Sequence, residues 1–102
     1  MRAVEQIANK IMTIEQAKAF MQACKTIGKT VAFTNGCFDI LHPGHLFSLA
    51  QTAKEADYLL VGLNSDASVK KLKGPERPIN NTESRASILA NLVLVDVVVV
   101  FE

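Results

Sequence analysis

Several residue types are scarce in this 102-residue chain, and each scarcity excludes a class of protein. Two cysteines, Cys24 and Cys37, are too few for a disulfide framework, and free thiols indicate the cytoplasm. No stretch of about 18 apolar residues could span a membrane, and the N-terminus, MRAVEQIANK, lacks the apolar core of a signal peptide. The 11 basic residues nearly balance the 10 acidic ones, so charge gives no argument for nucleic acid. We therefore expect a cytoplasmic chain that binds neither nucleic acid nor membrane.

Apolar residues, by contrast, make up 49% of the chain, at spacings that alternate between helix and strand. Thr13 and Gln16 form a capping-box pattern ahead of a helix that Gly28 closes. The predicted apolar stripe of that helix consists of Ile14, Ala17, Met21, Cys24 and Ile27. We expect residues 1–28 to form an N-terminal helical segment and residues 29–102 to form one domain.

The remaining segments predict three strands separated by helices. Strands are expected at 30–35 (TVAFTN), 58–64 (YLLVGLN) and 93–102 (VLVDVVVVFE), and helices at 46–56, 66–72 and 80–91. The last helix would begin at Asn80, with Glu83 three residues later. The order α-β-α-β-α-α-β predicts an α/β fold, a Rossmann-like parallel sheet with flanking helices.

Residues 34–46, TNGCFDILHPGHL, contain both histidines of the chain. The stretch begins at the carboxyl end of the first predicted strand, where parallel α/β sheets bind ligands. Pro43 suits the first position of a helix, so His42 and His45 would lie on one side of its first turn. The amides and dipole of a helix N-terminus favour an anion, and Gly44 leaves room for close approach. The pattern predicts a polyphosphate site in which two imidazoles stabilise the charge of an in-line transfer.

Other interpretations of these segments compete with that one. Residues 23–30, ACKTIGKT, nearly match a P-loop, but they close a helix instead of following a strand. Asn35-Gly36 could turn a hairpin, although no strand-like segment follows it. The two histidines could be plain loop residues that cap a helix. A zinc site is a weaker alternative, with ligands at Cys37, Asp39, His42 and His45 that match no standard spacing.

The segment GCFDILHPGH resembles the GxFDxxHxGH signature of the HIGH-motif (cytidylyltransferase-like) nucleotidyltransferase superfamily. Four motifs in order, TNGCFDILHPGH, GLNSDASVKKLKG, ERPIN and SRASIL, resemble those of the adenylyltransferases that make ADP-heptose for lipopolysaccharide core. The resemblance covers about Met12 to Glu102. It implies transfer of the adenylyl group of ATP to D-glycero-β-D-manno-heptose 1-phosphate, with Mg²⁺ bound mainly through the ATP phosphates. It also implies a homodimer, since dimers are common among such enzymes.

The same resemblance implies roles for individual residues. Those expected to act in catalysis are His42, His45 and Lys73. Those expected to bind the nucleotide are Thr34, Asn35, Gly36, Phe38, Asp39, Gly44 and Arg85, with Asp39 bracing the loop and Arg85 holding the nucleotide or its loop. Those expected near the second substrate are Asn64 and Asp66, while Lys70 and Lys71 are weaker phosphate candidates. No side chain is expected to bind a metal directly. The alternative for the lysines is a solvated helix face, and for Arg85 a surface ion pair with Glu83.

Two features of the sequence leave the activity open. Relatives that transfer a cytidylyl group to glycerol 3-phosphate carry an Arg shortly before the last Val-Asp, where this chain has Leu92, Val93 and Leu94. The superfamily domain also continues with further strands, a Gly-Gly-Asp segment and a Ser/Thr-Thr motif, so TVAFTN is expected to be an open sheet edge here. We expect an adenylyltransferase-like chain that is impaired as a fragment; an active enzyme, a cytidylyltransferase or a plain structural domain are the alternatives.

Overall fold

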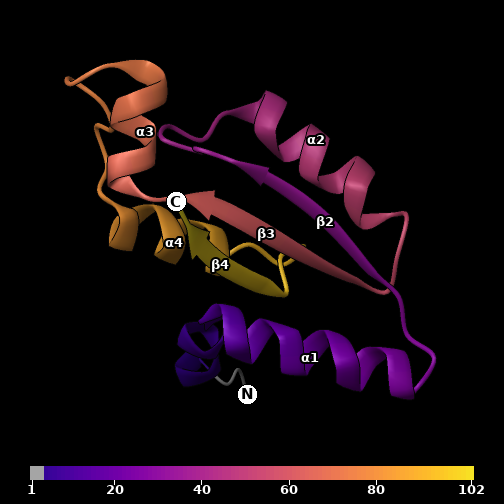
Figure 1. Ribbon diagram of the computed structural model, residues 1–102. Helices are drawn as coiled ribbons and strands as arrows, with labels where there is room; N and C mark the ends of the chain where they lie inside the picture. The colour runs from indigo at the N-terminus through magenta and orange to yellow at the C-terminus, as the bar shows by residue number, and fades with distance from the viewer. Residues whose placement is uncertain (1–3) are drawn as a thin grey trace.

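The computed structural model describes residues 4–102, and its strands form one parallel sheet (Figure 1). Across the sheet the strands lie in the order β1-β4-β3-β2. The elements are η1 (Val4–Lys10, a 3-10 helix), β1 (Ile11–Met12), α1 (Ile14–Thr26), β2 (Val31–Gly36), α2 (Pro43–Ala53), β3 (Tyr58–Asn64), α3 (Asp66–Lys73), α4 (Thr82–Ala90) and β4 (Val97–Phe101).

The α/β class and the Rossmann-like parallel sheet predicted from the sequence are confirmed. The predicted order corresponds to the elements from α1 to β4, and the structure adds η1 and the two-residue strand β1, which pairs with β4. The first three residues of the predicted N-terminal helical segment lie outside the described residues. As predicted, β2 is an edge strand of the described sheet. No helix within residues 4–102 is long and apolar enough to cross a membrane.

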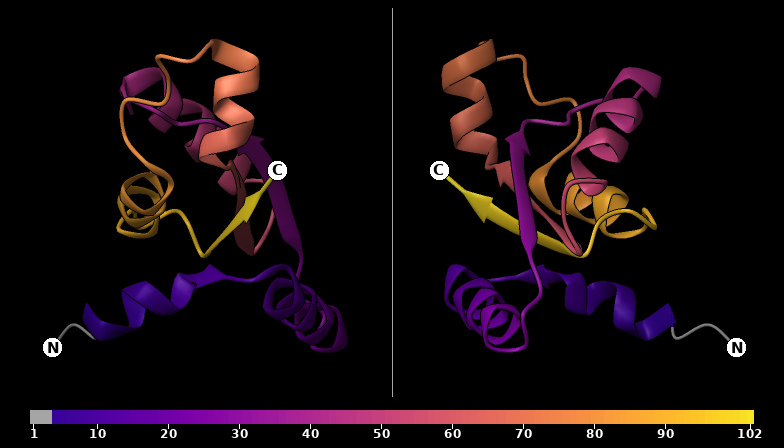
Figure 2. Two further views of the ribbon diagram at one scale, coloured as in Figure 1. Left: turned by 60° about the vertical axis from the view of Figure 1, so that its left-hand side comes forward. Right: turned by 90° about the vertical axis from the view of Figure 1, so that its right-hand side faces the viewer.

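Helices cover both faces of the sheet, with α1 on one side and α2, α4 and η1 on the other (Figure 2). The larger core joins residues such as Leu49 of α2, Val61 of β3 and Leu89 of α4. The smaller core packs Ala17 of α1 against Leu60. Because β3 lies between the two cores, six of its seven residues are buried, as its continuous apolar run predicts.

Both ends of α1 follow the sequence pattern. The amide of Gln16 donates to Oγ1 of Thr13 at 3.1 Å, and the amide of Thr13 donates to Oε1 of Gln16 at 2.9 Å. Gly28 follows the helix with φ of 77°, a left-handed conformation that glycine adopts without Cβ strain. Residues 23–30 therefore end a helix and lead into a strand, so the P-loop interpretation fails.

Three local predictions need correction. The N-cap of α4 is Asn81 and not Asn80, because Oδ1 of Asn81 accepts from the amide of Ser84 at 2.8 Å. The last strand begins at 97 and not 93: Val93 is 95% exposed in a turn that precedes the strand. The predicted stripe of α1 is only partly buried, at Ala17 and Cys24, because the face of the helix that packs on the sheet includes Phe20 and leaves Met21 about half exposed.

The packing of α4 gives the first test. Leu89→Ala should lower the free energy of unfolding by roughly 2–5 kcal/mol, because a fully buried side chain is replaced by a cavity. Ile88→Ala, in the same helix but 43% exposed, is the matched control and should cost under about 1 kcal/mol. Urea unfolding followed by circular dichroism measures both, and equal losses would contradict this orientation of α4.

Candidate active site

The two histidines shape the N-terminus of α2, as the sequence predicts. His42 is the N-cap residue and Pro43 the first residue of the helix. Nδ1 of His42 accepts from the amide of Gly44 at 3.0 Å, and Nδ1 of His45 accepts from the amide of His42 at 3.3 Å. The ring centroids lie 4.0 Å apart. Since each Nδ1 is an acceptor, the proton of each neutral ring lies on Nε2, which leaves two N–H donors at one helix end.

Two glycines are required for the close packing around these rings. A Cβ at Gly44 would lie 2.7 Å from Cε1 of His42, a separation that real Cβ atoms do not show. A Cβ at Gly36 would lie 3.0 Å from Cε2 of Phe38, whose backbone has φ of 45°. The Phe38 ring in turn meets His45 edge-on, with centroids 5.5 Å apart. The glycines of the motif therefore make room for the site's own rings.

A cleft of about 600 Å³ opens beside the histidines, beyond the carboxyl ends of β2 and β3. Of the predicted site residues, those that line it are Gly36, Phe38, Asp39, His42, His45, Asn64 and Lys73. Four others line it that the motif analysis did not name as site residues, namely Cys37, Ile40, Leu72 and Arg77. The predicted residues outside its lining are Thr34, Asn35, Gly44, Asp66 and Arg85. Asp66 and Lys70 line a separate hollow of about 230 Å³.

The cleft carries an excess of positive charge and N–H donors. Burial lowers the pKa of His45, and the nearby charges of His42 and Lys73 lower it further, so the ring is neutral near pH 7. Lys73 and Arg77 supply the full positive charges. Among the described lining residues Asp39 is the one carboxylate, and it is engaged by other groups. The cleft therefore suits an anionic ligand.

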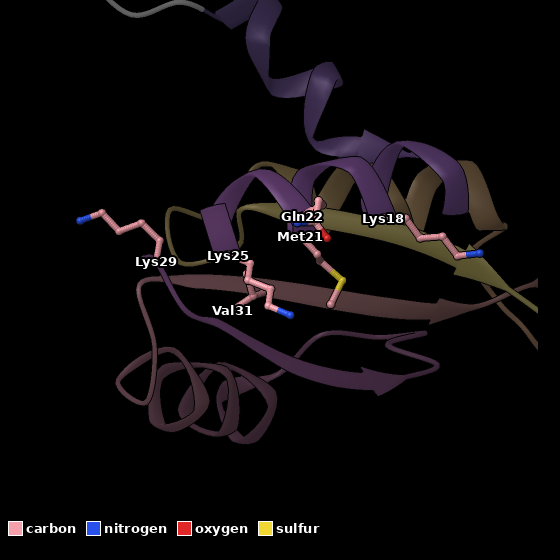
Figure 3. Close-up of a pocket in the computed structure, with 6 residues that line it drawn as sticks. All are labelled: Lys18, Met21, Gln22, Lys25, Lys29 and Val31. Carbon is pink, nitrogen blue, oxygen red and sulfur yellow. The ribbon is translucent and has the colours of Figure 1, made fainter. Parts of the chain in front are cut away.

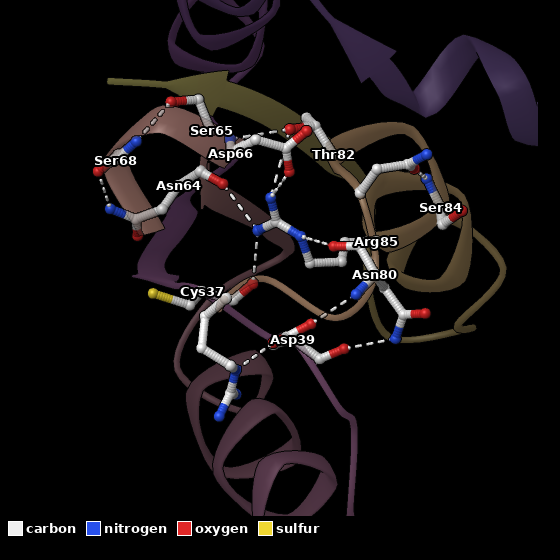
Figure 4. Close-up of polar contacts among 12 residues, drawn as sticks. Cys37, Asp39, Asn64, Ser65, Asp66, Ser68, Asn80, Thr82, Ser84 and Arg85 are labelled. Atoms are coloured by element: carbon white, nitrogen blue, oxygen red, sulfur yellow. Dashed lines mark hydrogen bonds and ion pairs between the residues drawn. The ribbon is translucent and has the colours of Figure 1, made fainter. Parts of the chain in front are cut away.

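Asp39 holds the loop that closes the cleft (Figure 4). Its carboxylate accepts from the amides of Ile79 and Asn80, each at 2.9 Å, and from Nε of Arg77 at 2.6 Å. Burial alone would raise the pKa of this carboxyl, but the two amides and the guanidinium outweigh burial and hold the pKa at about 2. The geometry fits the bracing role that the family resemblance implies for Asp39.

Arg85 lies beneath the cleft and is fully buried. Figure 4 shows its guanidinium among carbonyl and side-chain oxygens from several segments. It donates to the carbonyls of Cys37 (2.8 Å), Asn64 (2.7 Å) and Asn80 (2.9 Å), and to side-chain oxygens of Asp66 (2.8 Å) and Thr82 (3.3 Å). These five contacts use all five N–H groups of an arginine. Of the two predicted roles, the geometry fits holding the loop, and a surface ion pair with Glu83 is excluded.

The ion pair between Arg85 and Asp66 also sets the state of that carboxylate. Burial would raise the pKa of Asp66, but the hydrogen bond from Arg85 and those from Thr82 outweigh it, so the pKa is lowered. Asp66 thus stays ionised near neutral pH and completes the environment of the guanidinium. Asn64 contributes its carbonyl in the same way, while its side-chain amide donates to Oγ of Ser68 at 2.8 Å.

The described residues offer little to a metal ion. No group of three or more His, Cys, Asp or Glu side chains in residues 4–102 is arranged to hold one. Both oxygens of Asp39 are hydrogen bonded to the loop at 77–80, and Nδ1 of each histidine accepts an amide proton. The zinc interpretation therefore has no support in this geometry.

A second hollow, of about 520 Å³, lies between α1 and β2 (Figure 3). Its lining includes Lys18, Lys25 and Lys29 around Met21 and Val31. Figure 3 shows the side chains of Lys18 and Lys29 extending away from each other, so their charges do not converge on one point. The hollow thus lacks the combination of cations, imidazoles and helix amides found in the cleft.

Comparisons with known proteins match the segment that contains both histidines. A family model described as cytidylyltransferase-like matches residues 33–102, which include TNGCFDILHPGHL at 34–46. The bifunctional protein HldE of Caulobacter vibrioides is 52% identical over 93 residues, which are 91% of this chain and 19% of that protein. HldE of Azorhizobium caulinodans is 46% identical over 103 residues, 99% of this chain and 22% of that protein. The chain thus spans about a fifth of the length of these relatives.

A solved structure shows the same fold. The lipopolysaccharide core biosynthesis protein from Thermoplasma volcanium GSS1 superposes with a TM-score of 0.68 at 29% identity. The similarity covers 74% of this chain and 60% of that one.

The buried guanidinium gives a second test. Arg85→Gln should lower the free energy of unfolding by roughly 3–5 kcal/mol, because three carbonyls and Asp66 lose their buried partner. Glu83→Gln, at an exposed position of the same helix, is the control and should change it by under about 0.5 kcal/mol. If both variants unfold at the same midpoint urea concentration as wild type, the role given to Arg85 is refuted.

The low pKa of Asp39 gives a third test. Folding lowers this pKa from 3.8 to about 2, so the ionised carboxylate stabilises the fold above about pH 4. The contribution, roughly 2 kcal/mol, is lost as the pH falls through about 2. Urea unfolding between about pH 5 and about pH 2 should therefore show the advantage of wild type over Asp39→Asn shrinking as pH falls. An advantage independent of pH would contradict this account.

Proposed function

Because this chain belongs to the cytidylyltransferase-like family, we propose that its cleft binds a nucleoside triphosphate and serves nucleotidyl transfer. The family match also confirms the resemblance drawn from the four sequence motifs. The observation that carries the proposal is the pair of Nε2–H donors at the N-terminus of α2, in a cleft lined by two cations and one carboxylate. A triphosphate is a ligand that these groups suit together, since each of them favours phosphate oxygens.

In the proposed reaction a phosphate oxygen of a sugar 1-phosphate attacks the α-phosphorus of ATP. The bond from that phosphorus to the oxygen bridging to the β-phosphorus breaks, and pyrophosphate leaves with the electron pair. His42 and His45 donate hydrogen bonds to the phosphoryl oxygens where negative charge builds. Lys73 adds a positive charge from the end of α3. A neutral His45 keeps Nδ1 as the acceptor of the His42 amide and donates this hydrogen bond through Nε2.

The substrates follow from the relatives. HldE proteins that match 90% or more of this chain support ATP and D-glycero-β-D-manno-heptose 1-phosphate, giving ADP-heptose and pyrophosphate. The Thermoplasma protein, which is named for lipopolysaccharide core biosynthesis, supports the same choice. Use of ATP and two free cysteines agree with a cytoplasmic location. A homodimer remains part of the proposal, on the strength of the family resemblance.

Magnesium fits this cleft only as a partner of the nucleotide. The one carboxylate among the described lining residues, Asp39, is already bonded through both oxygens. The ion would therefore be held by ATP phosphates and water, where it neutralises phosphate charge. Gly36, His42 and His45 line the part of the cleft that the magnesium-bound nucleotide would approach.

The central test is pyrophosphate release by the purified chain with magnesium, ATP and heptose 1-phosphate. We expect slow release with ATP, as the impairment predicted from the sequence requires, and His45→Ala should lower the rate by roughly a further 10²–10³-fold because a donor to the transition state is lost. Gln51→Ala, at an exposed position of α2, is the control and should leave the rate unchanged. Release with CTP and glycerol 3-phosphate instead would favour cytidylyl transfer. Tight ATP binding without turnover would favour an inactive nucleotide-binding fragment.

A further inference from the structure

Two hollows meet at the same pair of cations. The cleft beside the histidines is lined on one side by Lys73 and Arg77. A second hollow of about 330 Å³ is lined by the same two residues together with Gly74, Pro75 and Glu76. Lys73 and Arg77 therefore border both hollows. An anion in the second hollow could lie next to an anion in the cleft beside the histidines.

Arg77 is oriented to present its guanidinium to a ligand. Its Nε donates to Asp39 at 2.6 Å, and its side chain is 37% exposed. Within residues 4–102 its two terminal nitrogens donate no hydrogen bond to the protein. This differs from Arg85, whose donors are all used inside the fold. The terminal N–H groups of Arg77 thus form a fixed, unused edge suited to two phosphate oxygens.

The rest of the second hollow favours hydroxyl groups over further phosphates. Glu76 lines it and is in neither of the ion pairs found among the described residues. A carboxylate accepts hydrogen bonds from hydroxyls and repels a polyphosphate tail. Gly74 has φ of 107° and no atom within 4 Å of the position of a Cβ, so the backbone there is open to a ligand. Two cations and one carboxylate in the same lining match a phosphomonoester attached to a polyhydroxyl group.

We propose that the hollow lined by Lys73, Gly74, Pro75, Glu76 and Arg77 is the acceptor subsite, with Arg77 and Lys73 binding the phosphate of a sugar phosphate and Glu76 accepting its hydroxyls. This inference rests on the proposed nucleotidyl transfer, and it places the attacking phosphate beside the cleft that holds the nucleotide. It also moves the acceptor away from Asp66, which pairs with Arg85 and lines a different hollow.

Calorimetric titration of the chain saturated with magnesium and α,β-methylene-ATP tests the subsite, because this analogue fills the cleft and cannot react. Arg77→Gln should weaken binding of heptose 1-phosphate and of inorganic phosphate by about tenfold or more, and binding of the analogue by a clearly smaller factor, since Arg77 also borders the cleft. Glu76→Gln should weaken heptose 1-phosphate several-fold and leave inorganic phosphate unchanged. Arg77→Lys, which keeps the charge, should restore part of the phosphate binding.

Lys54→Gln and Glu83→Gln are the charge-matched controls, since neither residue lines the two hollows and both are exposed. If Arg77→Gln weakens the analogue as much as the sugar phosphate, or weakens neither, the subsite assignment is overturned while the proposed function stands. If wild type binds no heptose 1-phosphate, the proposed substrate is wrong. In that case binding of inorganic phosphate that depends on Arg77 still supports the anion subsite, and binding that does not depend on it overturns the subsite.

Discussion

The buried guanidinium of Arg85 is the interaction on which the candidate site depends. A parallel sheet brings the carboxyl ends of its strands to one edge, but the loops that leave this edge diverge. Arg85 bonds to the carbonyl of Cys37 after β2, to that of Asn64 at the end of β3 and to that of Asn80 before α4. A buried charge is tolerated only when its hydrogen bonds are complete, and all five donors of this one have partners. One side chain therefore fixes three segments that are far apart in the sequence.

The cleft is built on this fixed base. Asp39, which lies two residues after Cys37, orders the loop at 77–80 and directs Arg77 through a single Nε contact. The histidines are held in the same way, each ring accepting a backbone amide at Nδ1 so that Nε2 carries the proton and acts as a donor. Donors that are oriented before the ligand arrives cost no reorganisation during the reaction, which is how enzymes stabilise developing charge.

Local patterns were sufficient to predict much of this arrangement. The Thr13 cap, the Gly28 stop and the start of α2 at Pro43 depend on residues within one turn of each other, and each is found as predicted. The role of Arg77 was missed because its partner lies 38 residues away, a distance that no spacing rule covers. Arginine is seldom fully buried, so the complete burial of Arg85 has no sequence signal either. The last strand was predicted too long because the turn before it contains Val93 and Leu94, which resemble strand residues in sequence.

The central claim is that the cleft at the N-terminus of α2 is the nucleotide site, and nuclear magnetic resonance tests it most directly. Titration of the ¹⁵N-labelled chain with magnesium-ATP should shift the amides of Gly36 and Gly44 and the Nε2 signals of His42 and His45. Signals of Lys18, Lys25 and Lys29, around the hollow between α1 and β2, should stay in place. Shifts confined to those lysines, or no shift at either histidine at saturating nucleotide, would contradict the account.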